Sequence, residues 1–198
     1  MEIDIKQFCT PTGYYGRCDE PFTYSGRTYA TNGHIIVSVP LMKSVTTEIP
    51  MKPESLDRVI EPINNASKFE KIPAWEQPPK RTCASCNGTG SVARCPECEG
   101  SGEIEFSNSH NSYSDECKTC DGFGAVHGDE IECASCDGKG TIQKSYPINM
   151  GNGIHINSDY LLQIESLPGA EIDLSHGPES IVPFRSDGVI GGVMPMRA

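Results

Sequence analysis

Four copies of one cysteine pattern constrain this chain more than any other feature of its sequence. Eight of the ten cysteines fall between Cys83 and Cys136, and each copy has the form Cys-x-x-Cys-x-Gly-x-Gly. The copies begin at Cys83, Cys95, Cys117 and Cys133, and their second cysteines are Cys86, Cys98, Cys120 and Cys136. Internal repetition of this kind predicts a small structural unit built from four similar turns.

The spacing within each copy suits a metal ion. Two residues between cysteines let both thiolates reach one ion from a tight turn, and a structural zinc ion takes four ligands in a tetrahedron. We therefore expect two Zn²⁺ as cofactors, in two closed Zn–Cys₄ sites that leave no position open for a catalytic water. The paired glycines after each turn supply the positive φ and the close backbone approach that such a turn needs.

Three other uses of the cysteines compete with zinc. Four disulfides need an oxidising compartment, and the N-terminal sequence MEIDIKQFCT carries no secretory signal. A thioredoxin-like redox pair is usually single and lies in a βαβ context. An iron–sulfur cluster also takes four cysteines, but the evenly built pairs favour zinc. Cys9 and Cys18 lie outside the repeats, and we interpret them as ordinary buried thiols, with a transient disulfide as the alternative.

The repeated motif resembles the cysteine-rich zinc finger of DnaJ-type co-chaperones over about residues 81–142. In that family the first turn pairs with the fourth and the second with the third. The resemblance implies one zinc site formed by Cys83, Cys86, Cys133 and Cys136, and a second formed by Cys95, Cys98, Cys117 and Cys120. It also implies an extended module of β-hairpins that helps to bind polypeptides.

The two flanks of the module contain short strands, turns and two helices. We expect strands over 27–31 and 34–39 with a turn between them. A helix begins at Pro53 and runs to about Ile63, where Pro62 ends or bends it, and a Pro-rich linker follows over 72–80. After the module we expect a strand over 153–156, a helix over 158–166, and strands over 171–174, 180–185 and 189–194.

The pattern of the second strand predicts how the sheet is buried. Ile35, Val37 and Val39 alternate with Ile36 and Ser38. Because successive side chains in a strand point to opposite faces, this alternation predicts a sheet with one well-buried face.

Parts of both flanks resemble the bacterial β sliding clamp subunit. The segment YATNGHIIV is similar to a clamp strand pair, and the sequence closes on MPMRA, similar to the terminal Met-Pro-Met-Arg of that family. The resemblance implies an α+β fold: a single clamp-like domain of antiparallel sheet with two helices, in residues 1–80 and 143–198, interrupted by the zinc module at 81–142. One such domain cannot encircle DNA, and a ring would need about six copies in a head-to-tail homo-oligomer.

In the clamp family the matching residues border an apolar pocket that binds short peptide motifs of polymerases and other clients. They are Gly33, His34, Met194, Pro195, Met196 and Arg197. The family pocket lies between two adjacent domains, so here one domain or a neighbouring subunit has to complete it. A simpler role, which we favour, makes Met194 and Met196 core residues of the last strand and His34 a turn histidine with satisfied hydrogen bonds.

Charge and composition argue against several functions. The chain carries a formal charge of −11, which opposes binding to nucleic acid through net charge. No apolar run approaches the roughly 20 residues that a membrane span needs. The sequence also contains no nucleophile elbow, no metalloprotease motif and no phosphate-binding loop, so we expect no enzyme.

The sequence predicts a non-enzymatic zinc-binding protein that serves as a protein or peptide interaction module. We expect it in the cytoplasm of a bacterial cell, with no membrane partner and no small-molecule substrate. A replication-type fold with a chaperone-type finger suits a phage or prophage replication accessory. The alternatives are a clamp-like ring or decoy that engages DNA or replication clients, chaperone-like binding of unfolded polypeptide, and an enzyme of thiol–disulfide exchange.

Overall fold

The computed structural model describes residues 4–10 and 18–197. The chain divides into two compact units. The flanking unit comprises Met1–Gln77 and Ser145–Ala198, and the cysteine unit comprises Pro78–Lys144. In the part of the chain described, no helix has the length and apolar character needed to cross a bilayer.

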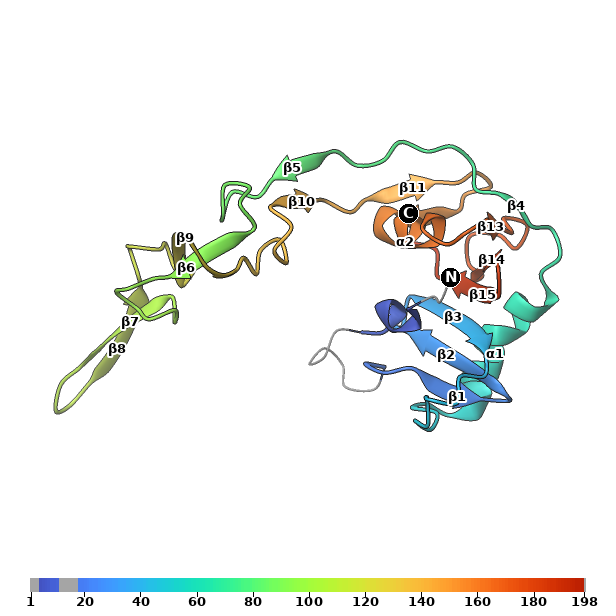
Figure 1. Cartoon of the computed structure of the whole chain (residues 1–198), viewed down its shortest axis with the longest axis horizontal. Coiled ribbons are helices and arrows are strands. Elements are labelled where there is room, and N and C mark those ends of the chain that lie inside the picture. The colour runs from blue at the N-terminus through green and yellow to red at the C-terminus, as the bar shows by residue number, and fades with distance from the viewer. Residues whose placement is uncertain (1–3, 11–17, 198) are drawn as a thin grey trace. The chain divides into compact units, whose positions relative to one another are not determined.

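A seven-stranded antiparallel sheet organises the flanking unit, in the order β1-β2-β3-β15-β14-β13-β4 (Figure 1). Its strands are β1 (Phe22–Tyr24), β2 (Arg27–Thr31), β3 (Ile35–Pro40), β4 (Glu70–Lys71), β13 (Glu171–Ile172), β14 (Val182–Ser186) and β15 (Val189–Val193). The parts of the flanking unit before and after the cysteine unit meet at the β3–β15 pair, where Val193 lies opposite Ile35. A smaller sheet pairs β11 (Pro147–Asn149) with β12 (His155–Asn157). The expected α+β class is confirmed, and strand ends differ from the expected ranges by up to two residues.

The described residues of the flanking unit also form the 3₁₀ turn η1 (Ile5–Phe8) and the helices α1 (Pro53–Asn65) and α2 (Ser158–Glu165). The Asn157 side chain caps α2 by accepting a hydrogen bond from the backbone N–H of Asp159 at 2.8 Å. Helix α1 contains Pro62 and ends at Asn65, two residues beyond the expected end near Ile63. Ile63 is buried in the core, and its packing holds the final turn in place despite the hydrogen bond that Pro62 removes.

Both faces of the large sheet are buried, so the expectation of one buried face was also wrong. Ile35 and Val37 of β3 belong to the core cluster that contains Leu161 of α2. Ile36, which lies between them, belongs to a second cluster with Leu56 of α1. Since neighbouring residues of a strand point to opposite faces, each helix covers its own side of the sheet.

The Pro-rich segment that follows β4 contacts the flanking unit close to Gln77, where the first part of that unit ends. The indole N–H of Trp75 donates to a carboxylate oxygen of Glu165 in α2 at 2.7 Å, and the ring packs against the larger core cluster. The hydroxyl of Tyr146 donates to the carbonyl of Glu76 at 3.0 Å. These contacts anchor the first part of the segment that the sequence predicts as a linker.

A buried carboxylate ties two loops of the flanking unit together. Asp173 is 1% exposed and accepts hydrogen bonds from the backbone N–H groups of Ser67, Lys68 and Ser175 at 3.2, 2.9 and 3.0 Å. His176 lies 3.6 Å away. Burial by itself raises the pKa of Asp173, but these hydrogen bonds and His176 outweigh burial and hold the pKa at about 2.

The cysteine unit is a nested series of antiparallel strand pairs. The outermost pair is β5 (Lys80–Thr82) with β10 (Thr141–Gln143), the next is β6 (Ser91–Arg94) with β9 (Ala125–Glu132), and the innermost is β7 (Glu103–Ser107) with β8 (Ser112–Glu116). The β7–β8 turn is closed by a hydrogen bond from the N–H of Asn108 to the carbonyl of Asn111 at 2.9 Å. Cysteine turns separate the successive pairs.

Candidate metal centres

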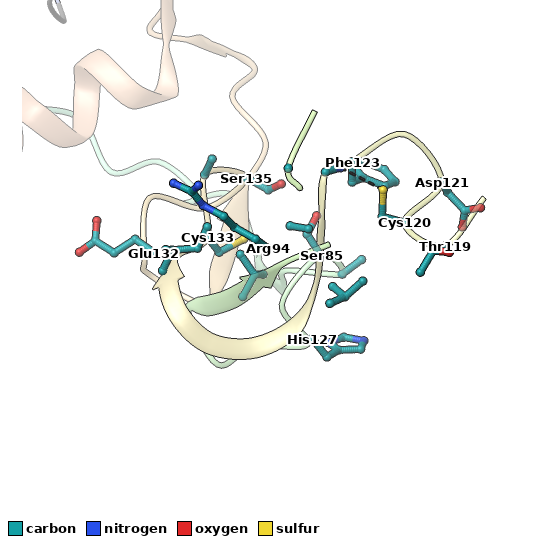
Figure 2. Close-up of a pocket in the computed structure, with 18 of the residues that line it drawn as sticks. Ser85, Arg94, Thr119, Cys120, Asp121, Phe123, His127, Glu132, Cys133 and Ser135 are labelled. Atoms are coloured by element: carbon teal, nitrogen blue, oxygen red, sulfur yellow. Dashed lines mark hydrogen bonds between the residues drawn. The ribbon is translucent and has the colours of Figure 1, made fainter. Parts of the chain in front are cut away.

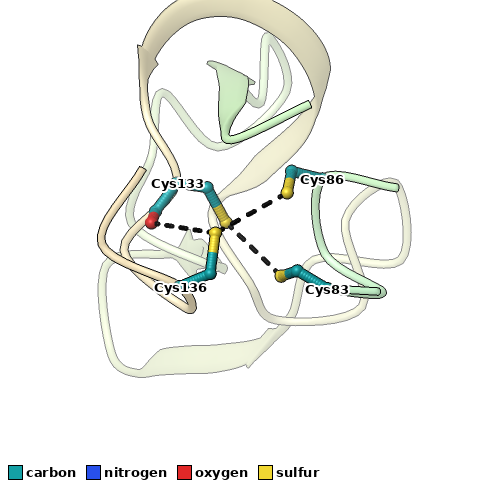
Figure 3. A group of neighbouring side chains, drawn as sticks. All are labelled: Cys83, Cys86, Cys133 and Cys136. Atoms are coloured by element: carbon teal, nitrogen blue, oxygen red, sulfur yellow. Dashed lines mark hydrogen bonds between the residues drawn. The ribbon is translucent and has the colours of Figure 1, made fainter. Parts of the chain in front are cut away.

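The eight cysteines of the repeats form two groups of four, each with all its sulfur atoms within 4.8 Å of one another. The first and fourth turns supply Cys83, Cys86, Cys133 and Cys136, drawn in Figure 3, and the second and third turns supply Cys95, Cys98, Cys117 and Cys120. We call these groups site 1 and site 2. They are the two sets that the DnaJ resemblance implied. Each turn offers its two thiols from one side of the site and the partner turn offers two from the other.

The sulfur spacing fits one zinc ion per site. Across site 1 the Cys83–Cys133 and Cys86–Cys136 sulfur pairs are 3.9 and 3.7 Å apart. The corresponding pairs of site 2 are 3.8 and 3.7 Å apart. A tetrahedron with zinc–sulfur bonds of about 2.3 Å has edges of about 3.8 Å, whereas a disulfide bond is about 2.0 Å long. Each group can therefore bind one zinc, which confirms two Zn²⁺ as the expected cofactors.

All eight thiols are buried, and the backbone around them is arranged to stabilise thiolates. The second glycine of every repeat donates its N–H to the second cysteine sulfur of the same repeat. These bonds run from Gly90 to Cys86, Gly102 to Cys98, Gly124 to Cys120 and Gly140 to Cys136, at 3.2 to 3.3 Å. Two such bonds reach each site, from opposite sides, and help offset the negative charge of four thiolates.

The repeated glycines also interlock paired turns. In site 1 the N–H of Cys83 donates to the carbonyl of Gly140 and the N–H of Cys133 donates to the carbonyl of Gly90, both at 2.9 Å. A Cβ built on Gly140 would overlap the carbonyl group of Gly88, and one built on Gly90 would overlap that of Gly138. The second glycine of each turn is therefore required by direct contact with the first glycine of the partner turn. Site 2 repeats this arrangement.

The second cysteines of paired turns differ in acidity. Burial raises the pKa of Cys86, but hydrogen bonds from the backbone of Gly90 and Gly88 and from neighbouring thiols outweigh it and bring the pKa to about 6. Burial and the hydrogen-bonded thiols around Cys136 raise its pKa to about 12. In site 2 the pKa of Cys98 is lowered to about 6 and that of Cys120 is raised to about 12 for the same reasons. Zinc binding must therefore displace protons, and the affinity of both sites rises with pH.

A hollow of about 740 Å³ lies between the turns of the two sites (Figure 2). Its lining combines exposed apolar side chains, among them Phe123 at 73% exposed and Ile131, with the hydroxyl groups of Ser85, Thr119 and Ser135. Because its walls belong to turns of both sites, zinc bound at the two sites would hold these walls in place.

A second, smaller hollow of about 300 Å³ lies in the flanking unit, at the end of β15. It is lined by His34, Asn157, Tyr160, Met194, Pro195, Met196 and Arg197. The N–H of Met194 donates to the carbonyl of His34 at 2.7 Å, and the His34 ring stacks on Tyr160 with centroids 6.0 Å apart. One unit thus brings together five of the six residues matched to the clamp pocket. Gly33 belongs to the adjoining turn, with φ at +88°.

The simpler role favoured for the two methionines was wrong. Met194 and Met196 are 42% and 36% exposed, because β15 ends at Val193 and both follow it. His34 does lie in the turn before β3, where its backbone N–H donates to the Asn32 side chain at 3.0 Å, and its ring also stacks on Tyr160. Asn157 and Tyr160 also line the hollow. Their position at the start of α2, next to the strand end, is the signal that could have found them.

The remaining cysteines and histidines lie away from the metal groups. Cys9 is buried and Cys18 is half-buried, and both are free thiols; the segment 11–17 between them lies outside the described residues. Burial raises the pKa of Cys9 to about 11, so this thiol stays protonated near neutral pH. His127 contacts the side chain of Asn87 at 3.2 Å and His110 lies at the β7–β8 turn. Neither histidine belongs to a four-cysteine group.

Comparison with known proteins identifies one relevant relative. A stretch of 49 residues is 39% identical to the chaperone protein DnaJ of Treponema denticola, which is 22% of this chain and 13% of that protein. No family model matches the chain, and no solved structure matches it. The short match and the two four-cysteine groups together fit a DnaJ-type zinc finger. The comparisons give no support to the sliding-clamp resemblance, which stays a prediction.

Proposed function

We propose that this chain is a non-enzymatic zinc protein whose cysteine unit binds segments of other polypeptides. The observation that carries the proposal is the hollow of about 740 Å³ between the two four-thiol sites. The exposed side chains of Phe123 and Ile131 suit contact with apolar side chains of a partner. The hydroxyl groups that line the hollow can form hydrogen bonds with unpaired backbone groups of the partner. The similarity to a chaperone in the DnaJ match supports the same class of partner.

The closed form of the metal sites supports the absence of enzymatic activity in this proposal. Each zinc would be held by four buried thiolates, so it has no open position for a water or substrate. The same thiolates would be engaged by metal and thus withheld from thiol–disulfide exchange. In this proposal zinc shapes the binding surface and takes no part in chemistry.

A titration with an unfolded polypeptide tests this function. The zinc-loaded chain is mixed with a fluorescently labelled, reduced and carboxymethylated protein, and anisotropy reports binding. We expect Phe123→Ser to weaken binding at least about tenfold, as loss of a central aromatic contact does. Leu41→Ser, which changes an exposed apolar residue of the flanking unit, serves as the matched control and leaves binding within about twofold. Undiminished binding by the chelator-treated chain would contradict the proposal.

A second candidate function rests on the hollow at the end of β15. We propose that this hollow accepts a short peptide, as the clamp resemblance suggests, with the flexible Met194 and Met196 adapting to its apolar side chains and Arg197 to a carboxylate. This candidate places the chain in the bacterial cytoplasm as a phage or prophage replication accessory, either as a decoy for replication clients or as a subunit of a ring.

Two measurements test the second candidate. A labelled peptide carrying the clamp-binding motif of a bacterial polymerase should bind the chain, and Met196→Ser should weaken it at least about fivefold, whereas Phe123→Ser should not. Native mass spectrometry then separates a decoy from a ring, because a ring needs a closed oligomer and a decoy does not. Absence of peptide binding by the folded, zinc-loaded chain would refute the candidate.

A further inference from the structure

The hairpin formed by β7 and β8 presents an unpartnered aromatic face. Phe106 and Tyr113 lie directly opposite each other in the strand register, and they are 57% and 60% exposed. Residues opposite each other in an antiparallel pair point to the same face, so the two rings share one side of the hairpin. Most of the apolar surface of these two rings remains exposed to water. A cross-strand pair of exposed aromatic rings therefore forms a surface suited to contact with a partner.

The same hairpin carries four acidic side chains and neither lysine nor arginine. Glu103, Glu105, Asp115 and Glu116 lie within its strands, and the range 103–116 contains no lysine or arginine. Asp115 follows Tyr113 by two residues, so its carboxylate lies on the aromatic face. Glu103 and Glu116 stand opposite each other on the other face. Like charges opposite each other destabilise a strand pair.

The neutralising contacts around these acids are exposed and weak. Lys118, just beyond β8, lies 3.8 Å from Glu116, and both side chains are more than half exposed. The hydroxyl of Ser114 donates to a Glu103 carboxylate oxygen at 2.6 Å and brings no positive charge. The hairpin therefore carries net negative charge, with Asp115 on the face of the two rings and Glu103, Glu105 and Glu116 on the opposite face.

We propose that the β7–β8 hairpin binds a basic segment of a partner protein, rich in arginine. A guanidinium group can stack on Phe106 or Tyr113 and at the same time pair with Asp115, since arginine both stacks on aromatic faces and binds carboxylates through two N–H groups. Glu103, Glu105 and Glu116, on the opposite face, add long-range attraction for further cations of the segment. This charge complementarity favours a basic protein segment over nucleic acid, and over a second copy of a chain whose net charge is −11.

No residue of the β7–β8 hairpin lines the hollow between the zinc sites, so the two surfaces can be tested separately. The zinc-loaded full chain is titrated with a short fluorescein-labelled peptide in which arginines alternate with serines. A peptide with glutamate in place of each arginine is the ligand control. We expect the arginine peptide to bind with an affinity that falls as salt rises, and the glutamate peptide not to bind.

Two kinds of variant locate the site. Phe106→Ser with Tyr113→Ser removes both rings, and Glu105→Gln with Asp115→Asn removes two charges while keeping side-chain shape. Each pair should weaken the arginine peptide at least about tenfold, whereas Phe123→Ser should change it less than about twofold. Native mass spectrometry showing two zincs confirms that a variant retains its fold. All changed side chains are exposed or half-exposed, and the charge pair is isosteric.

Several results overturn the proposal. One is equal binding of the glutamate peptide, and another is full binding by both hairpin variants. A third is a loss of arginine-peptide binding in Phe123→Ser as large as that in the hairpin variants, which would assign the peptide to the hollow between the zinc sites instead. Tighter binding of labelled duplex DNA than of the arginine peptide would replace a protein partner by nucleic acid. Unfolded-polypeptide binding that survives Phe123→Ser would contradict the proposed function, but this inference would stand as long as the hairpin variants still weaken the arginine peptide.

Discussion

The interlocked glycines provide the sharpest test of how the zinc sites are built. Gly138 and Gly140 belong to the same turn of site 1 and have nearly the same backbone angle, with φ at +70° and +69°. They differ in what a side chain would meet. A Cβ on Gly138 would lie 3.5 Å from the Glu132 side chain, an ordinary contact, whereas one on Gly140 would overlap the carbonyl of Gly88. Alanine at the two positions therefore separates backbone strain from steric overlap.

The structure gives a magnitude for each change. An alanine at positive φ costs about 1 kcal/mol in either variant. Gly140→Ala must also push the partner turn away, which weakens the hydrogen bond from Cys83 to Gly140 and the N–H to sulfur bond at Cys136. At about 1 kcal/mol for each bond, the total is about 3 kcal/mol. Because folding of the unit and zinc binding are coupled, this cost appears as lower zinc affinity.

Competition with a chromophoric chelator at fixed pH measures the effect. We expect Gly138→Ala to lower the zinc affinity of site 1 by about fivefold and Gly140→Ala by roughly a hundredfold, since each 1.4 kcal/mol is tenfold. Site 2, formed by other turns, remains loaded and serves as the internal reference in native mass spectra. Equal losses in the two variants would refute the argument, because the steric contact between turns would then contribute nothing to metal binding.

Three further outcomes are expected. Removing zinc with a strong chelator should unfold the cysteine unit, which NMR would report as a loss of chemical-shift dispersion. The fluorescence of Trp75, the single tryptophan, should stay unchanged because this residue packs in the flanking unit. A shift of that fluorescence would show that the flanking unit also needs zinc. Asp173→Asn should lower the free energy of unfolding of the flanking unit by about 2 kcal/mol at neutral pH, measured by urea denaturation. The folded-state pKa of Asp173 is about 2, below its ordinary value of 3.8, so this contribution is present above about pH 4 and should be lost as pH falls towards 2, with no such loss in the variant. Leu56→Ala should destabilise the flanking unit by about 2 to 5 kcal/mol, because Leu56 is fully buried against the sheet, and a smaller effect in thermal unfolding would place α1 outside the core.

The metal centres could be predicted from the sequence because their chemistry is local. Two cysteines separated by two residues already face one ion, so eight of them predict two zinc ions without knowledge of the fold. The choice of partner turns is different, since it depends on how β6 pairs with β9 and β7 with β8. Spacing alone left that choice open, and the DnaJ resemblance supplied it. The contact of Gly140 with Gly88 also lies between turns, so no local pattern indicates it.

The errors in the flanks share a physical cause, which is burial decided by distant parts of the chain. Ile35, Ile36 and Val37 form a run of apolar residues, a pattern typical of a strand covered on both faces, but covering both faces required α1 and α2 to lie on opposite sides. Met194 and Met196 have the apolar character of core residues, yet the sheet ends at Val193 and leaves both beside an open hollow. The residue type predicts which side chains can be buried, and the topology of the sheet and helices decides which of them are buried.

The pairing of β5 with β10 has a consequence for how such a chain can evolve. Thr82 lies opposite Thr141, and the Gln143 side chain donates to the carbonyl of Pro78 at 2.9 Å, so the first and last residues of the cysteine unit are neighbours. To the flanking unit, the whole zinc unit is then equivalent to one loop between β4 and β11, whose closure entropy grows only slowly with length. A relative could lose the unit, or exchange it for another with a different partner, without altering a single core residue of the flanking sheet.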